Sequence, residues 1–391
     1  MTSLKALLLS MGLVLCLAGT ALAQQQISIG YLSLKDDPRY GADVVYARIE
    51  IAPGGDPVHG ARMGIDDLKI VSDASKQAFT LNQQQGTDLA SLLAKLGEMA
   101  NAGERFVILD LPANLADQLA AASRDLPVTL INATAPEDFL RGRCYPNLLH
   151  SAASDRMNAD ALVQYLRTRN WTKVLILVGP EARDQAVAES FRAAAERLRL
   201  NIVDTRSFTL ATDPANREAN NPLLLTGNAD YDAVYIADAQ GEFARYIPYA
   251  TQLPRPVVGS TGLVSTEWQW SSERYGAPQV TSRFATMTNG RRMTGLDWST
   301  WMAAKAIVTA YAKARSDDPA AIADYLRSSR LRLDGSKGVQ LGFRSWDGQM
   351  RMPIMLATHN AVIAQAPLEG FQHQTNDLDT LGTDEPEHKC E

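Results

Sequence analysis

The chain has 391 residues, with 38 Lys and Arg against 44 Asp and Glu, so its formal net charge is -6 at pH 7. A nucleic-acid backbone binds clustered basic side chains, and without a basic excess we expect no nucleic-acid partner. A chain of this length exceeds one ordinary hydrophobic core, so we expect two lobes.

The first 23 residues have the pattern of a secretory signal peptide. Lys5 precedes an apolar run that closes on Ala21-Leu22-Ala23, a small-x-small cleavage pattern. No later stretch approaches the roughly 20 apolar residues that a membrane span needs. We therefore expect cleavage after Ala23, an exported protein and no stable membrane insertion. The alternative is an uncleaved anchor.

Short apolar runs alternate with amphipathic segments along the rest of the chain. The apolar runs are continuous and rich in Val, Ile and Leu, which is typical of parallel strands buried on both faces. They cover residues 27–34, 106–111, 128–133, 173–179, 201–208, 232–238 and 256–261. The helical patterns between them cover residues 86–103, 113–124, 155–170 and 184–200. Repeated strand–helix order predicts an α/β fold with parallel sheets.

The pattern stops in a segment that contains Pro and Gly and restarts at residue 173, which predicts two such sheets. Two further helices are expected at 296–315 and 318–330. Two strands around the turn at Asp347-Gly348 follow them.

Two cysteines, Cys144 and Cys390, remain after the signal peptide. In an oxidising compartment an even pair is most simply a disulfide, which over so long a loop contributes up to roughly 5 kcal/mol in the chain-entropy model. The alternative is a pair of free thiols that act as soft metal ligands, but no CxxC spacing supports it.

Motifs of catalysis are missing from the sequence. There is no GxSxG, HExxH, GxxxxGK[ST] or GxGxxG after a strand, and the five histidines are scattered. We therefore predict that the protein is not an enzyme and requires no cofactor.

Open α/β sheets bind ligands beyond the carboxyl ends of their strands. Small and hydroxyl residues there leave backbone N–H groups open to an anion, whereas Asp184 and Asp238 suit a cation. The predicted ligand-binding residues are Pro112, Ala113, Asn114, Asn132, Ala133, Thr134, Asp184, Asp238, Gln240 and Thr261. The alternative is that each one belongs to ordinary turn and cap chemistry.

Tryptophans occur in two different patterns. Trp298 and Trp301 share one helix face, which predicts that they lie in the core. Trp268 and Trp270 alternate in TEWQW, where the alternatives are the edge of a cleft and interior packing.

The stretch PVTLINATAPEDFLRGRCYPNLLHSAASDRMNADALVQYLRTRNWTKVLILVG resembles the central segment of type 1 periplasmic binding proteins, the leucine/isoleucine/valine-binding family of ABC transporter substrate-binding receptors. The resemblance extends over nearly all of the mature chain. RRMTGLDWSTWMAAKAI, LATHNAVIAQAPLEGF and HQTNDLDTLGTDEPEHKC resemble the branch associated with PQQ-dependent alcohol dehydrogenase systems.

The resemblance implies two Rossmann-like lobes with parallel central sheets, joined by a hinge of three crossovers near 147–151, 259–263 and 333–338. Residues 24–148 plus 262–335 would form the N-terminal lobe, and 149–261 plus 336–370 the C-terminal lobe. The lobes would close on a small ligand and deliver it to ABC permease subunits at the inner membrane, and a monomer is expected. The alternative is a periplasmic sensor or assembly partner of the same fold.

The family also assigns roles to particular positions. Asn132, Ala133 and Thr134 fall in its second carboxylate-binding loop, whereas DLPANLAD replaces its loop of Ser and Thr. Asp238 stands where an aromatic residue commonly packs on the substrate, and Thr261 lies near the place of the acid that holds the amino group. The loss of both the hydroxyl loop and that acid puts an α-amino acid ligand in doubt.

The end of the chain, residues 371–391, is an acidic tail that the resemblance ties to the first crossover through Cys144 and Cys390. Hard oxygen ligands suit Ca²⁺ or a lanthanide ion, and some quinoprotein alcohol dehydrogenases use these ions. The candidate metal ligands are Asp377, Asp379, Asp384, Glu385 and Glu387. The alternative, which we favour, is a tail that is simply solvated.

Overall fold

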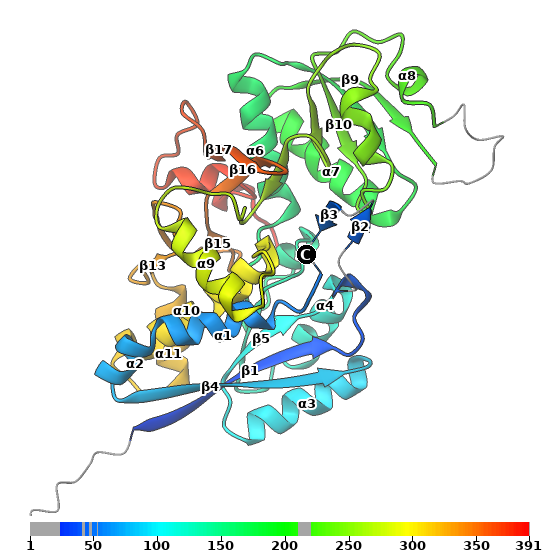
Figure 1. Ribbon diagram of the computed structural model, residues 1–391. Coiled ribbons are helices and arrows are strands. Elements are labelled where there is room, and N and C mark those ends of the chain that lie inside the picture. Colours follow the sequence, from blue (N-terminus) through cyan, green and yellow to red (C-terminus); the bar gives the residue numbers. More distant parts are fainter. Residues whose placement is uncertain (1–23, 41–43, 47–48, 53, 210–219, 391) are drawn as a thin grey trace, which may run out of the picture.

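The computed structural model describes residues 24–40, 44–46, 49–52, 54–209 and 220–390. The signal peptide expected over residues 1–23 lies outside this range. Two parallel sheets with flanking helices lie at opposite ends of the molecule, and a region of short antiparallel strands lies to one side between them (Figure 1). Across the described ranges, no helix combines the length and the apolar character that crossing a bilayer requires.

The first sheet has five parallel strands in the order β4-β1-β5-β6-β7. These are β1 (Gln25–Leu34), β4 (Gln77–Gly86), β5 (Phe106–Asp110), β6 (Thr129–Asn132) and β7 (Leu148–His150). The strands predicted at 27–34, 106–111 and 128–133 are therefore confirmed. The sequence missed β4, a polar edge strand whose residues are mostly half-buried. Helices α3 (Leu89–Asn101) and α4 (Ala113–Ala122) follow β4 and β5.

The N-terminal helices pack against a helix from much later in the chain. Helix α1 (Val58–Asp67) lies against α10 (Gly295–Ala314), and a Cβ atom on Gly60 or Gly64 would stand 2.0 or 2.6 Å from a backbone oxygen of α10. These two glycines therefore permit the close approach of the helices. Trp298 and Trp301 of α10 are fully buried, which confirms the predicted core position. The neighbouring helices are α2 (Lys69–Ala74), α9 (Ala277–Met287) and α11 (Pro319–Arg327).

The second sheet has four parallel strands in the order β11-β10-β8-β9. These are β8 (Lys173–Val178), β9 (Asn201–Ser207), β10 (Ala233–Ala237) and β11 (Val257–Gly259), as the apolar runs predicted. The accompanying helices are α6 (Asp155–Thr168), α7 (Ala182–Arg197) and the short α8 (Pro222–Leu225). Every residue of β10 is buried, because the sheet is covered on both faces.

Antiparallel strands, here called the hinge region, connect the two sheets. Strands β12 (Val264–Thr266), β16 (Ile354–Thr358) and β17 (Ala361–Ala366) form one sheet. Strands β13 (Leu333–Asp334), β14 (Gln340–Phe343) and β15 (Met350–Arg351) form another, with the turn at Asp347-Gly348 between β14 and β15 as predicted. The remaining short elements are η1 (Pro38–Tyr40), β2 (Val44–Tyr46), β3 (Ile49–Ala52), α5 (Phe139–Gly142), η3 (Ala244–Tyr249), η4 (Asp377–Thr380) and η5 (Glu385–Glu387).

Buried polar side chains tie the segments of the hinge region together. Glu267 Oε1 accepts a hydrogen bond from the backbone N–H of Ala153 at 3.1 Å. Lys337 is fully buried and donates to the backbone oxygen of Pro353 at 2.8 Å. Arg141 donates to Gln349 at 3.0 Å. Buried side chains thus hold three stretches of chain, residues 141–153, Glu267 and residues 337–353, in a fixed arrangement.

Candidate ligand-binding site

A buried carboxylate marks the carboxyl end of the first sheet. Asp110 ends β5 and accepts hydrogen bonds from Tyr31 at 2.9 Å, Tyr40 at 2.6 Å and Arg39 at 3.1 Å. Burial raises the pKa of the Asp110 carboxyl, although the Arg39 guanidinium opposes the shift. Arg39 also donates to the Thr134 hydroxyl at 3.3 Å. The chain's own guanidinium and phenol groups therefore occupy the edge where the sequence predicted open backbone N–H groups.

The predicted residues of this first edge have different environments. Asn132 is fully buried, and its side chain accepts from the N–H of Thr134 and Ala135 and donates to the Ala135 oxygen. It therefore holds its own loop in place, which is the turn chemistry left open as the alternative. Ala133 is also fully buried.

Three further predicted residues lie where β5 leads into α4. Pro112 is the residue that precedes the helix. Ala113 is buried, whereas Asn114 is exposed. Ligand contact through these residues stays a prediction.

At the second sheet, the two predicted aspartates satisfy backbone N–H groups. Asp184 is 1% exposed and accepts from Glu181 N–H at 3.1 Å, in a capping box at the start of α7, and from Ala239 N–H at 2.6 Å. Asp238 is 2% exposed and accepts from Gly241 at 3.0 Å, Phe243 at 2.9 Å and Ala244 at 2.8 Å. Both side chains use their acceptor capacity on loop backbone, again the cap chemistry of the alternative. Gln240 is exposed.

An ion pair joins the starts of the two helices next to this edge. Arg183 of α7 donates to both carboxylate oxygens of Asp155 in α6. Burial raises the pKa of the Asp155 carboxyl to about 6. A hydrogen bond of 2.6 Å from Ser190 to Asp138 then links α7 to the loop after β6. The two halves of the molecule are therefore in direct polar contact on this side.

A hollow of about 770 Å³ opens where the chain leaves β11. Its walls come from residues 245–262 of the second half, from residues 264–270 and 292–295, and from the turn between β16 and β17. The lining side chains with polar or aromatic groups include Arg245, Tyr249, Thr261, Trp268, Trp270, Arg292, Thr294 and His359. Among the five hollows described, only this one is lined by a predicted ligand-binding residue, which is Thr261.

The TEWQW segment contributes both of its tryptophans to the hollow. Trp268 is 2% exposed and so also packs in the interior, whereas Trp270 is half-buried beneath the guanidinium of Arg292. Trp268 therefore fits the alternative of interior packing, and Trp270 fits the alternative of a position at the edge of a cleft. Arg292, Tyr249 and His359 were missed, and the only signal for Arg292 is its position in RRMTGLDW, just before the helix predicted at 296–315.

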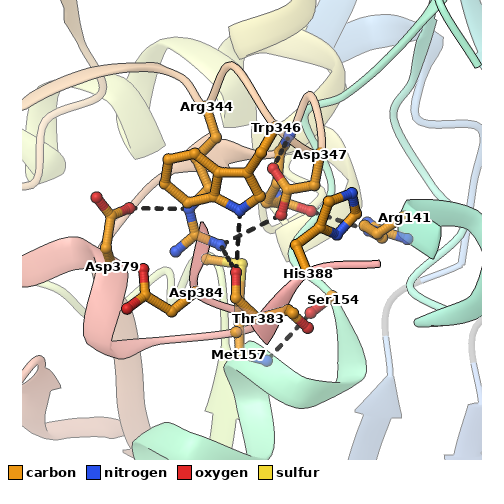
Figure 2. A network of polar contacts seen from close by, with 12 residues as sticks. Arg141, Ser154, Met157, Arg344, Trp346, Asp347, Asp379, Thr383, Asp384 and His388 are labelled. Carbon is orange, nitrogen blue, oxygen red and sulfur yellow. Dashed lines mark hydrogen bonds and ion pairs between the residues drawn. The ribbon is translucent and has the colours of Figure 1, made fainter. Parts of the chain in front are cut away.

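The disulfide predicted between Cys144 and Cys390 is present, with a Cα–Cα distance of 5.5 Å. The interpretation of the tail as a solvated segment is wrong. Figure 2 shows the tail against Arg344 and Trp346 of the hinge region, with Asp379 and Thr383 in contact with them. Arg344 is completely buried and also donates to the backbone oxygens of Leu378 and Leu381.

Helices α6 and α7, which flank the second sheet, also bind the tail. Arg197 of α7 donates to the backbone oxygens of Thr380 at 2.8 Å and Gly382 at 3.0 Å. The N–H of Gly382 donates to Asp160 of α6 at 2.8 Å. Since Leu381 is fully buried as well, the tail is part of the folded body.

The five candidate metal ligands of the tail are not gathered around one point. Asp379 is paired with Arg344 at 2.9 Å and Arg351 at 2.8 Å, and Asp384 with His373 at 3.0 Å. Asp377 accepts from the His373 N–H at 2.9 Å, Glu385 lies in η5, and Glu387 stands 3.7 Å from Arg197. The one three-residue cluster with metal-binding geometry in the described chain is Cys144, His388 and Cys390, whose sulfurs are already joined to each other. The geometry therefore gives a calcium or lanthanide site no support.

Two parallel sheets, a hinge region and a hollow beside the end of β11 define a two-lobed binding protein of the α/β class. The family model described as "Periplasmic binding protein" matches residues 85–362. No curated protein matches the chain.

Solved structures agree with this architecture. A branched chain amino acid ABC transporter periplasmic ligand-binding protein from Burkholderia xenovorans LB400 has a TM-score of 0.68 at 14% identity, over 87% of this chain and 95% of that chain. A branched-chain amino acid transporter substrate binding protein from Streptococcus pneumoniae, in complex with isoleucine, has a TM-score of 0.63 at 15% identity, over 87% and 99%. A solute binding protein of an ABC transporter from Rhodopseudomonas palustris BisB5, in complex with 3,4-dihydroxy benzoic acid, has a TM-score of 0.61 at 10% identity, over 85% and 93%.

The chain belongs to the periplasmic binding protein family. It is a solute-binding protein and not an enzyme, which confirms the prediction drawn from the missing catalytic motifs. Membership of this family also places it in the periplasm.

Proposed function

We propose that this protein is the receptor of an ABC transporter and binds a small solute between its lobes. The observation that carries the proposal is the hollow of about 770 Å³, whose walls come from both predicted lobes. This volume lies within the range of ordinary small-molecule sites. The solved relatives with isoleucine and with 3,4-dihydroxy benzoic acid bind small molecules on the same fold.

The proposed mechanism is closure of the lobes around the hinge region. Thr261 lies on the second-lobe side of the hollow, and Trp270 and Arg292 lie on the first-lobe side under the predicted boundaries. A ligand that touches both sides has more contacts when the lobes are closed, so it shifts the population toward that state. The other predicted residues, such as Asn132, Asp184 and Asp238, then hold the loops that shape the two edges.

A screen of the purified, exported protein tests the binding function. Thermal unfolding is measured against alcohol-derived acids, amino acids, amines, the quinone cofactor and metal complexes. A ligand at 100 times its Kd adds about 2.7 kcal/mol to the free energy of unfolding, which is a readily measured shift in Tm. A hit is expected in one chemical class, and no shift in any class contradicts the proposal.

The partner of the receptor forms a separate part of the proposal. A transporter receptor should stimulate the ATPase of its permease complex in liposomes when ligand is present. A periplasmic sensor or assembly partner of the same fold would bind the ligand without this stimulation.

The link to PQQ-dependent alcohol oxidation rests on the resemblance of the segments around α10, β17 and the tail. Deletion of the gene is expected to slow growth on a primary alcohol and to leave growth on succinate unchanged. Equal growth on both carbon sources contradicts the link and leaves the receptor function intact.

A further inference from the structure

We propose that the hollow selects a small organic acid without an ammonium group, and that Arg292 holds its carboxylate. The inference rests on the proposed receptor function and adds the chemical class of the solute. It depends on three features of the described residues: an uncommitted guanidinium, the lack of Asp and Glu among the residues that line the hollow, and the aromatic walls.

The first feature is the contrast between two consecutive arginines. Arg291 donates to both carboxylate oxygens of Asp297, at 2.8 Å each, and is thereby fully engaged. Arg292 makes no hydrogen bond or ion pair within the described part of the chain, and its Cζ lies 4.0 Å from the centroid of the Trp270 ring. Stacking fixes the plane of a guanidinium and leaves its N–H donors free at the edge. Such a fork is suited to two parallel hydrogen bonds with a carboxylate.

The second feature is the charge of the walls. Among the described residues that line the hollow, none is Asp or Glu, whereas Arg292 contributes positive charge. Thr261 stands near the place where the family resemblance expects an acid for the amino group. Its hydroxyl donates to no described residue, so it is free to bind a neutral polar atom. An ammonium group would be desolvated beside the guanidinium of Arg292, with no carboxylate among the lining residues to pair with it, which disfavours amino acids and amines.

The third feature is the apolar and aromatic surface beside these groups. Trp268, Trp270, Met293 and Val264 line the hollow next to the arginine. Trp270 and Val264 are half-buried and can cover apolar atoms of a ligand, as in ordinary solute sites, whereas Trp268 and Met293 are each 2% exposed. The expected ligand therefore has a carboxylate at one end and an apolar body at the other.

Matched ligands test this inference by calorimetry on the full exported protein. The series comprises 3-phenylpropanoate, phenylalanine and 2-phenylethylamine, which share a ring, together with 4-methylpentanoate and leucine, which share an aliphatic body. At least one carboxylate of the series should bind, and the matched compound that carries an ammonium group on the same body should bind at least about tenfold more weakly.

Arg292→Gln should weaken the binding of that carboxylate by about 10- to 100-fold, because two charge-assisted hydrogen bonds are lost. Arg292→Lys keeps the charge but not the fork, so an intermediate loss is expected. Arg274→Gln is the matched control: Arg274 is exposed and does not line this hollow, so the same change in net charge should leave affinity unaltered. An unchanged Tm of Arg292→Gln shows that the variant is folded.

Equal or tighter binding of the amino acid overturns the inference, as does undiminished carboxylate binding by Arg292→Gln. Either result leaves the receptor function standing, because a ligand has then been found. Failure of every carboxylate in the series overturns the inference too. The receptor function itself fails only if the wider thermal screen also shows no ligand.

Discussion

The substitution Asp379→Asn removes the charge that neutralises the buried arginine of the tail. Arg344 is completely buried and lies 2.9 Å from Asp379, and the more distant Asp347, at 3.5 Å, is its other carboxylate partner. Arg351 loses the same partner at 2.8 Å. Removal of one member of a buried ion pair costs about 3–5 kcal/mol, because the remaining charge is left without compensation. Since the Leu378 and Leu381 oxygens still accept from Arg344, we expect a loss of about 3 kcal/mol.

Urea denaturation followed by tryptophan fluorescence measures this loss, and Trp346 lies within the network itself (Figure 2). Asp377→Asn is the matched control, because Asp377 is exposed in the same tail and should change stability by less than about 0.5 kcal/mol. If Asp379→Asn stays within about 0.5 kcal/mol of the wild type, the tail does not stabilise the body and the reasoning is refuted.

Three further predictions concern the tail and the hinge region. Reduction of the disulfide between Cys144 and Cys390 should lower the free energy of unfolding by about 2–4 kcal/mol and lower Tm. Calorimetry with and without a reductant measures this loss. The Cys144→Ser, Cys390→Ser double variant is the control and should not respond to the reductant. Burial lowers the pKa of Lys337 to about 7, so above pH 7 the unfolded chain binds a proton that the folded chain does not, and stability should rise with pH. Between pH 7.5 and 9.5 the wild type should gain about 2 kcal/mol relative to Lys337→Met in urea unfolding, and a constant difference would show that the buried lysine keeps its proton. Titration with Ca²⁺ or La³⁺ should give no binding heat, with or without residues 376–391, and a saturable heat that requires the tail would restore the metal hypothesis.

Continuous runs of apolar residues are the feature of the sequence that predicted most of the fold, because such runs form strands that are buried on both faces. The strands β8 and β10 have apolar residues on both faces, so short runs of Val, Ile and Leu were sufficient to locate them. Strand β4 was not predicted, because it is an edge strand that pairs only with β1 and carries four Gln and Asn residues in its second half. The disulfide was predictable because the compartment and the even number of cysteines leave few alternatives.

The candidate site was predicted less well, because a strand end and a helix start compete for the same residues. Asp238 lies in the loop after β10 and Asp184 in the first turn of α7, and backbone N–H groups of this edge donate to both carboxylates. The tail was misjudged for a different reason. Its acidic composition is visible in the sequence, whereas Arg344 and Arg197, which bind it, come from distant parts of the chain.

The distance between the lobes, with and without the acid selected by calorimetry, tests the central claim most directly. Spin labels on Glu98→Cys in α3 and Glu189→Cys in α7, whose native side chains are 63% and 73% exposed, place one probe on each lobe. Pulsed electron paramagnetic resonance should show a shorter and narrower distance distribution once the ligand is bound. A ligand that binds tightly and leaves this distribution unchanged would contradict closure around a shared site.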